Sequence, residues 1–386
     1  MPTETGQIGA LSSPSRYGLD PGTHYLYTGA LAPPLADVTR AMVRTRNLQR
    51  RGPLGRAAIY EVEEATRRSV AVLAHTHKDN VSFVGDASTA WNLIAQGLEW
   101  RDGDNVVIND MEHPAVVMPW LKMSRRGLQV RVVRRTPDWE IDPEDIRRAC
   151  DSRTRAVVVS HVSYMGGFRH DLGTVCEVAR EAAAAFFVDY SHSLGVMPSD
   201  FSSCDIGVSA SYKWTLGPYG TGIVLWNRKR YPQFEPGSVG WRSLSNLYTP
   251  DRFEQINLRA DARRFQLGAP GFSAVAGVGA GVDHLLDLGI ERVAQHAIEL
   301  SGQCVDALRE IGLEVITPID PAKRAGNVAF LHPHGAKIAE RLSERGIHVW
   351  GGDGRVRASF HVLNSSDDVS AFVAALKVIL NQERGN

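Results

Sequence analysis

Short apolar runs alternate with segments of helical periodicity from about residue 57 onward. This alternation favours an α/β fold with a largely parallel sheet, because crossover helices join strands that run in the same direction. In the first part of the chain, strands are predicted at 80–84, 105–109, 130–133, 156–161, 185–189, 206–210 and 222–226. Helices are predicted between them at 59–75, 87–98, 115–126, 142–149 and 172–184.

The alternation is interrupted by residues 232–261, where Pro, Gly, Ser and Asn predict a loop-rich crossing between domains. A long helix at 274–288 follows, and a smaller α/β unit is predicted after it, with helices at 290–311, 335–345 and 367–382 and strands at 328–331, 347–350 and 355–359. At 386 residues, the chain is long enough for two domains. We therefore predict an N-terminal segment (1–25) that packs on the small domain, a large domain (26–255) and a small C-terminal domain (256–386).

The balance of charge points to a small-molecule partner. Forty-three basic residues match forty-three acidic ones, so no bulk field favours nucleic acid or a membrane surface. No run approaches the roughly 18 apolar residues of a membrane span, and the N-terminus lacks the apolar core of a signal peptide. The four cysteines are scattered, without metal-ligand spacing. We expect a cytoplasmic protein with free thiols and no structural metal.

One lysine differs from the others in its surroundings. Lys213 follows the small, weakly polar run Val-Ser-Ala-Ser-Tyr and precedes Trp214, whereas other lysines have polar or basic neighbours, as in HTHKDN and NRKR. A semi-buried amine loses hydration, so its pKa falls towards a value at which the neutral form can make a Schiff base. Lys213 is therefore the candidate catalytic lysine.

Two further residues follow a neighbouring predicted strand. Asp189 ends the apolar run Ala-Ala-Phe-Phe-Val, and a carboxylate at the end of a buried strand is costly unless it meets a cation. A protonated pyridine nitrogen is such a cation, and an acidic partner keeps that ring an electron sink. His192 lies three residues further on, within reach of a ring oxygen or an imine.

Two weaker signals occur at other strand ends. Gly85-Asp86-Ala87-Ser88-Thr89 joins a strand to a helix N-terminus, where backbone N–H groups and hydroxyls can hold a phosphate. His113, in Met-Glu-His-Pro, follows another strand and is a candidate for stacking on a cofactor ring. Ligands of parallel α/β sheets bind at the carboxyl ends of strands, so all these residues are predicted at one edge.

The chain resembles the class V aminotransferase-like group of fold-type I pyridoxal 5′-phosphate (PLP) enzymes. This group includes cysteine desulfurases, kynureninases, isopenicillin N epimerase and cysteine-conjugate C–S lyases. The resemblance extends from about Tyr25 to the C-terminus, with segments in the family's order at 86–92, 112–120, 161–166, 188–195, 211–222, 264–268 and 355–364. It implies a large domain with a mostly parallel seven-stranded sheet, a smaller C-terminal α/β domain, PLP as cofactor, and a homodimer with active sites at the interface.

The resemblance also implies roles for individual residues. It makes Lys213 the Schiff-base lysine, Asp189 the pyridinium partner and Arg357 the residue that binds the substrate carboxylate, a role that suits a guanidinium fork. The remaining cofactor-binding positions are His192 at the ring oxygen, His113 stacked on the ring, Tyr164 where relatives contact the ring oxygen through Asn, and Ala87, Ser88, Tyr212 and Trp241 near the phosphate.

Departures from the family's motifs guide the choice of reaction. The segment 347–357 lacks the nucleophilic cysteine that desulfurases carry before the substrate arginine, so a persulfide-forming desulfurase is disfavoured. Asp86 and Ala87 stand where relatives have Gly and Thr, and the segment LGAPGF (267–272) lacks the Thr that relatives extend to the neighbouring subunit's phosphate.

We predict a PLP enzyme acting at the α-carbon of an amino acid, as a β-eliminating C–S lyase on a cysteine S-conjugate in a specialised biosynthetic pathway. An aminotransferase, an epimerase or a decarboxylating oxidative deaminase of the same family remains open, because fold does not fix chemistry. A non-catalytic scaffold is the remote alternative.

Overall fold

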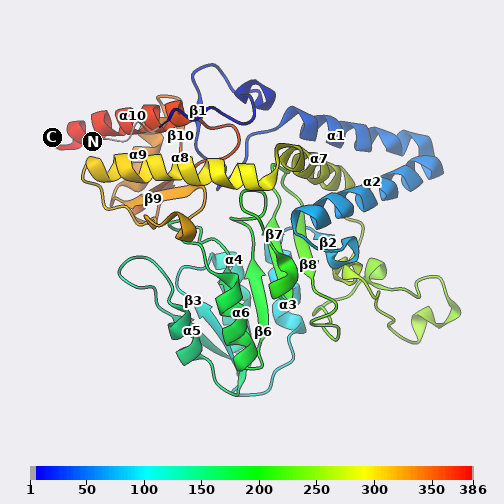
Figure 1. Ribbon diagram of the computed structural model, residues 1–386. Coiled ribbons are helices and arrows are strands. Elements are labelled where there is room, and N and C mark those ends of the chain that lie inside the picture. Colours follow the sequence, from blue (N-terminus) through cyan, green and yellow to red (C-terminus); the bar gives the residue numbers. More distant parts are fainter. Residues whose placement is uncertain (1–5, 385–386) are drawn as a thin grey trace.

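A seven-stranded sheet forms the centre of the computed structural model, which describes residues 6–384 (Figure 1). Its strands are β2 (Val81–Val84), β3 (Asn105–Asn109), β4 (Gln129–Val133), β5 (Thr154–Ser160), β6 (Ala185–Asp189), β7 (Ile206–Ala210) and β8 (Gly222–Trp226). The spatial order is β2-β8-β7-β6-β5-β3-β4. All neighbouring pairs are parallel except those of β8, which runs antiparallel to both β2 and β7. The predicted, mostly parallel seven-stranded sheet is confirmed.

Helices cover both faces of this sheet, which explains why most of its strands are largely apolar. In β5, Val157 and Val159 contribute to one core and Ala156 and Val158 to the other, because successive side chains point to opposite faces. The first core is shared with α2 (Gly52–Leu73), α5 (Pro143–Ala149), α6 (Leu172–Glu181) and α7 (Phe272–Leu288), and the second with α3 (Ala87–Gly97) and α4 (Pro114–Ser124).

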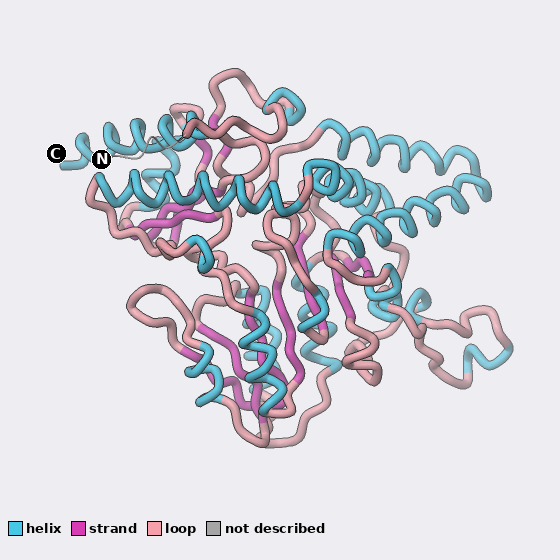
Figure 2. The backbone as a smooth tube through the Cα atoms, viewed as in Figure 1, coloured by secondary structure: helices cyan, strands magenta, loops and turns pink. Residues whose placement is uncertain are grey.

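A separate core holds the C-terminal part of the chain together. Strands β9 (Asn327–Leu331), β11 (Trp350–Gly352) and β12 (Arg355–Ser359) form an antiparallel sheet in the order β11-β12-β9. The helices of this part are α8 (Ile290–Glu310), α9 (Gly335–Ser343) and α10 (Ser366–Arg384). This sheet and its helices lie beside the carboxyl edge of the large sheet (Figure 2).

The predicted strand 347–350 is in fact two strands with different partners. β10 (Ile347–His348) pairs in parallel with β1 (His24–Tyr25), and β11 pairs with β12. The N-terminal segment also contacts the small domain through Ile8, whose N–H donates to Ser366 Oγ. Val349 separates the two strands. Because it is apolar, the sequence pattern gave no sign of a break and predicted one uninterrupted strand.

Helix α7 packs with the large domain, although the boundary expected at residue 255 assigns it to the C-terminal part. It lies against α2 and against α1 (Ala36–Leu48), a helix that the sequence pattern did not reveal. Small residues permit close packing of α7: a Cβ at Gly279 would lie 2.6 Å from Thr66 Oγ1 of α2, and one at Gly281 would collide with the carbonyl oxygen of Thr215, which follows β7. The packing therefore groups α7 with α1 and α2.

The predicted loop-rich crossing projects from the body of the molecule at the right of Figure 1. It contains short 3₁₀ helices at Trp241–Ser243 and Pro250–Phe253; others lie at Pro14–Tyr17, Gln49–Arg51, Lys78–Asn80, Phe201–Ser203, Ala262–Phe265 and Pro321–Lys323. Within residues 6–384, no helix combines the length and the apolar character that crossing a membrane requires.

Candidate active site

The carboxyl ends of neighbouring parallel strands bring the predicted catalytic residues together. Asp189 is the last residue of β6, and His192 follows it in the next turn. Lys213 follows the end of β7 by three residues, in a turn where the Leu216 N–H donates to the Lys213 carbonyl. Lys213 Nζ lies 3.1 Å from His192 Nε2. The sequence prediction that these residues share one sheet edge is therefore matched by their geometry.

Burial controls the protonation of Lys213. The residue is 8% exposed, and loss of hydration lowers the pKa of its amine to about 8. The charge of Asp189 acts in the opposite direction, and the charge of Arg357 adds to the lowering. A substantial fraction of this amine is therefore neutral near physiological pH, which is the form that attacks a carbonyl or accepts a proton.

His192 is held by a residue of the small domain that the sequence analysis did not identify. Asn327, the first residue of β9, places Nδ2 3.0 Å from His192 Nδ1. The Ser359 hydroxyl donates to Asn327 Oδ1 at 2.9 Å, which orients the amide with its N–H₂ towards the imidazole. His192 therefore accepts at Nδ1 and carries its proton on Nε2, facing Lys213. Burial keeps its pKa well below the usual value, so the ring is neutral.

Asp189 is a buried carboxylate with neutral hydrogen-bond donors. It is 5% exposed, and its oxygens accept from Trp91 Nε1 at 2.9 Å and from the Ser191 N–H at 2.8 Å. Among the described residues it forms no ion pair within 4.0 Å. A buried carboxylate in this state is stabilised by a cation placed against it.

A second buried carboxyl group lies near Asp189. Glu112 accepts from the Ser160 N–H at 2.8 Å, from the Ser160 hydroxyl and from Asn109 Nδ2 at 2.6 Å. Burial, with a smaller contribution from the Asp189 charge, raises the pKa of Glu112 to about 7. These contacts connect the ends of β3 and β5, and the sequence analysis assigned Glu112 no role.

The predicted phosphate loop begins α3. Ala87 and Ser88 occupy the first turn, where backbone N–H groups have no intrahelical acceptor. Asp86 caps the helix by accepting from the Thr89 N–H at 2.6 Å. Nearby, the ring of Tyr212 lies under Lys213 Nζ at 5.8 Å. The loop therefore offers N–H donors at a helix N-terminus, with an acidic residue at the cap.

His113 and Tyr164 lie together beside His192. The His113 and Tyr164 rings meet edge to face at 5.0 Å, and the Tyr164 ring lies 6.4 Å from that of His192. His113 caps α4 by accepting from the Ala115 N–H at Nδ1, and the pKa of its imidazole is lowered by burial and by the Lys213 charge. Its remaining surface is exposed in the single chain, as required of a ring that stacks on a bound group.

Arg357 projects from β12 of the small domain. It is 3% exposed, and Nη1 donates to the Tyr164 carbonyl, while Nε has no hydrogen-bond partner among the described residues. Burial, followed by the charge of Arg355, lowers the pKa of the Arg357 guanidinium to about 9. The charge of Arg357 lowers the pKa values of Lys213, His192 and His113, so the guanidinium lies close to this group.

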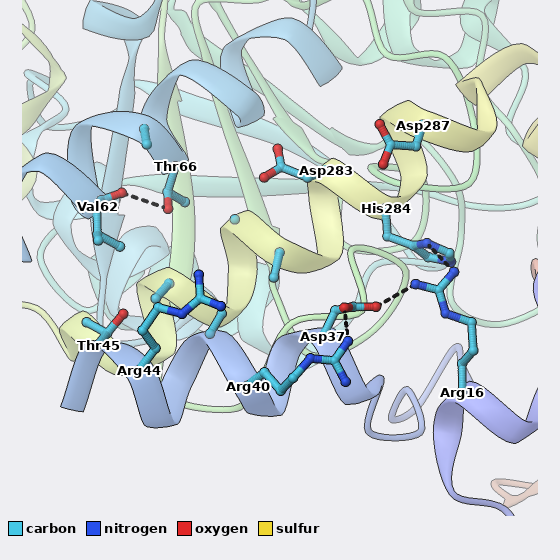
Figure 3. A pocket seen from close by; sticks show the side chains of 15 residues that line it. Arg16, Asp37, Arg40, Arg44, Thr45, Val62, Thr66, Asp283, His284 and Asp287 are labelled. Atoms are coloured by element: carbon cyan, nitrogen blue, oxygen red, sulfur yellow. Dashed lines mark hydrogen bonds and ion pairs between the residues drawn. The ribbon is translucent and has the colours of Figure 1, made fainter. Parts of the chain in front are cut away.

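Trp241 lies away from this group. It is exposed on the projecting segment and lines a cavity of about 310 Å³ with Arg56, Tyr60 and Phe272. The cavity in Figure 3, of about 540 Å³ between α1, α2 and α7, contains none of the predicted site residues. Three of its charged side chains are paired, because Arg16 and Arg40 both contact Asp37.

The aminotransferase class-V family model matches residues 25–372. The chain belongs to this family. Curated relatives are a probable cysteine desulfurase of Methanothermobacter thermautotrophicus, 29% identical with 92% of this chain and 94% of the relative covered, and one of Pyrococcus abyssi, 27% identical with 84% of each covered.

Solved structures of the same fold also match this class V chain. An apo cysteine desulfurase from Thermococcus onnurineus NA1 superimposes with a TM-score of 0.85 at 24% identity, covering 97% of this chain and 100% of the other. The cystine C–S lyase C-DES, solved with its product cysteine persulfide, has a TM-score of 0.85 at 21% identity, covering 92% and 97%. Another C-DES structure carries glycine covalently linked to the PLP cofactor. The predicted family and the fold-type I architecture are confirmed.

PLP is the cofactor of class V enzymes, and the residues of this chain fit it. Asp189 offers a buried carboxylate without an ion-pair partner among the described residues, which suits a pyridinium nitrogen. Lys213 offers an amine of lowered pKa, and the first turn of α3 offers N–H donors for a phosphate.

Replacing Asn327 with alanine is expected to lower turnover by about 5- to 30-fold, the equivalent of about one to two kcal/mol for a lost buried donor. The reason is that His192 would no longer be restricted to the tautomer with the proton on Nε2. Asn327→Asp should have a larger effect, because a carboxylate favours the proton on Nδ1. Ser359→Ala should have the smallest effect. The measurement is kcat with the absorbance spectrum of the loaded enzyme across pH; an unchanged pH profile in Asn327→Asp would contradict this assignment.

Proposed function

We propose that this chain is a PLP-dependent C–S lyase that cleaves the Cβ–Sγ bond of a cysteine S-conjugate. The observation that carries the proposal is a desulfurase-like site without a thiol. The segment 347–357 contains no cysteine, and the four cysteines lie elsewhere: Cys176, Cys204 and Cys304 are buried, and Cys150 is partly buried. A sulfur atom released from the substrate therefore leaves in the product and is not transferred to the chain.

The cofactor would be held at several positions. Asp189 would meet the pyridine nitrogen, Lys213 would bond the aldehyde carbon, and His192 would donate from Nε2 to the ring oxygen. The N–H groups of Ala87 and Ser88 would hold the phosphate, with Tyr212 beside them. His113 would stack on the ring. When bound, PLP supplies an electron sink for the pair left at the α-carbon.

The residues of the chain perform the remaining tasks. Arg357 binds the substrate carboxylate with its guanidinium fork and fixes the α-carbon relative to Lys213. Lys213 Nζ accepts the α-proton, a role for which a pKa of about 8 is well matched to neutral pH. For Lys213 Nζ to be free for this role, the substrate amine would first have taken its place at the aldehyde carbon. The Cβ–Sγ bond then breaks with its electron pair on sulfur, and the thiolate takes a proton. The remaining enamine hydrolyses in water, so the balanced products are a thiol, pyruvate and ammonium.

The test is product analysis with purified enzyme, PLP and a series of S-alkyl- and S-arylcysteines. The lyase should release thiol, pyruvate and ammonia in equal amounts, and L-cysteine should yield pyruvate. A desulfurase would instead form alanine and a persulfide on the protein, which adds the mass of sulfur. Absence of pyruvate from every conjugate would contradict the lyase proposal. Oxo-acid-dependent amino transfer, solvent deuterium at an inverted Cα, or oxygen consumption would identify an aminotransferase, an epimerase or an oxidative deaminase.

We further infer that the active enzyme is a cytoplasmic homodimer of a specialised biosynthetic pathway, with its active sites at the subunit interface. The support within this chain is the projecting segment, which carries Tyr248, Phe253 and Ile256 as large, exposed apolar side chains; Phe253 is 86% exposed. Several large apolar side chains exposed on one projecting segment are more common at a protein interface than on a free surface. Trp241 lies on the same segment. In such a dimer it would approach the site that holds the cofactor phosphate in the partner subunit.

A further inference from the structure

Two arginines project from the same face of β12. Arg355 and Arg357 are separated by one residue, so their side chains lie on one side of the strand. Both are almost completely buried, at 1% and 3% exposure. Like charges placed this close in a buried setting repel each other, and Arg355 contributes to the lowered pKa of Arg357. Such a pair is stabilised when anions bind to it.

Arg355 has donors that the rest of the described chain does not satisfy. Its Nε and Nη2 are buried without a hydrogen-bond partner among the described residues, as is the Nε of Arg357. The carboxylate within ion-pair distance in the described chain is Asp353, 3.6 Å from Nη1 and largely exposed at the β11–β12 turn. Unsatisfied buried N–H groups are costly and rare in folded proteins. Arg355 is therefore poised to bind an acceptor from outside the chain.

Aromatic contacts place Arg355 next to the candidate active site. Its guanidinium lies 5.2 Å from the ring centre of Tyr164 and 4.7 Å from that of Trp350. The Trp350 ring also contacts Arg357, at 5.4 Å, and the Tyr164 carbonyl accepts from Arg357. Tyr164 in turn contacts His113 and lies near His192. Arg355 is thus separated from the residues around Lys213 by a single aromatic ring.

We propose that Arg355 is a second anion-binding position, so that the substrate carries a carboxylate besides its α-carboxylate. This inference rests on the proposed function, in which Arg357 binds the α-carboxylate. On a cysteine S-conjugate the second carboxylate belongs to the thiol that leaves. The guanidinium fork suits a carboxylate, which accepts from Nε and Nη2 together. Arg355 then determines which conjugates are accepted and takes no part in bond breaking.

A binding experiment tests the inference without turnover. The PLP-loaded enzyme is titrated calorimetrically with succinate, glutarate and adipate and with the monoamide of each, which differs by one anionic group. For the chain length that spans both arginines, the diacid should bind about 10- to 100-fold more tightly than its monoamide. Equal affinity within all pairs would overturn the inference, and this comparison needs no variant.

Variants assign the preference to Arg355. Arg355→Met keeps the contact with Trp350 and should bring the diacid to the affinity of its monoamide, while Arg355→Lys should keep part of the difference. Arg345→Met, which replaces a half-exposed arginine of the same domain, should leave the difference unchanged. If Arg355→Met retains the full preference, Arg355 serves only to pack between Trp350 and Tyr164.

Turnover separates this inference from the proposed function. S-Carboxymethylcysteine and S-carbamoylmethylcysteine have nearly the same shape, and kcat/KM should favour the acid by about 10-fold or more through KM. Equal cleavage of both would overturn the role of Arg355 and leave the lyase intact. Cleavage of neither would count against the lyase, and the diacid binding would still decide the role of Arg355.

Discussion

Replacing Lys213 with alanine is expected to lower turnover by at least about 10³-fold, because in the proposed function this amine would be both the covalent attachment point of the cofactor and the acceptor of the α-proton. The geometry singles out this lysine: its Nζ is buried, 3.1 Å from His192 Nε2, and within the electrostatic influence of Asp189. Borohydride should fix the cofactor's mass to the peptide containing Lys213 in the native enzyme and to no peptide of the variant.

Lys377→Ala is the matched control, because it removes an exposed lysine of α10. It should retain activity and the reducible adduct. A Lys213→Ala enzyme with native turnover and a reducible, yellow adduct would rule out the assignment. Added primary amines should restore part of the activity if the missing group is a proton acceptor.

The pH dependence of cofactor uptake follows from the same amine. Burial lowers the pKa of Lys213 to about 8, so the neutral, nucleophilic form increases as the pH rises through about 8. In the unfolded chain the amine keeps its ordinary value of 10.5 and holds its proton up to higher pH. The cost of burying the charged form is therefore present below about pH 8 and is relieved between there and 10.5. The uptake rate of apoenzyme should rise with a midpoint near 8 and should lose that midpoint in Lys213→Ala.

Replacing Asp189 with asparagine is expected to lower turnover by roughly 10²- to 10³-fold, the effect of leaving one member of a buried ion pair without its partner. Asparagine keeps the size of the side chain but removes the charge that would keep the pyridine nitrogen protonated. Its amide also cannot accept from both Trp91 Nε1 and the Ser191 N–H in the present arrangement. Steady-state kinetics and a cofactor-binding titration measure the two consequences separately.

Glu112→Gln is the control for Asp189→Asn. Glu112 is also a buried carboxyl group near the sheet edge, but burial raises its pKa to about 7, so an amide imitates its protonated form. This variant should lose far less activity than Asp189→Asn. Equal losses in the two variants would show that any change of a buried carboxyl group in this region is disruptive, and would remove the support for a pyridinium partner.

The sequence predicted the large sheet well because most of its strands are buried runs with a clear end; the edge strand β4 is the exception. The bounds predicted for β3, β6, β7, β8 and β12 agree with the structure. In these strands every residue except the partly buried Ala185 is buried. In β3, β6, β7 and β8 a mostly apolar run of five residues stops at a polar residue or a turn, and this pattern marks the strand in the sequence.

The elements that escaped prediction depend on distant parts of the chain. Helix α1 is largely polar, and Val38 and Thr45 are its only buried residues. It packs against α7, which lies more than 200 residues later in the sequence. Asn327 was missed for the same reason, because its contact with His192 spans 135 residues and two domains. Asp189, His192 and Lys213 could be predicted from the sequence because each lies at or shortly after the end of a strand.

The pairing of β9 with β12 joins two functions in one rigid ladder. Asn327 lies opposite Ser359, and Arg357 lies opposite Ala329, two residues along the same pair of strands. Any tilt of this ladder that draws Arg357, the proposed carboxylate-binding residue, closer to Lys213 would therefore also move the Asn327 amide that contacts His192. In the proposed function, substrate binding and the protonation of the imidazole would then be thermodynamically linked, and each would influence the other by the same free energy.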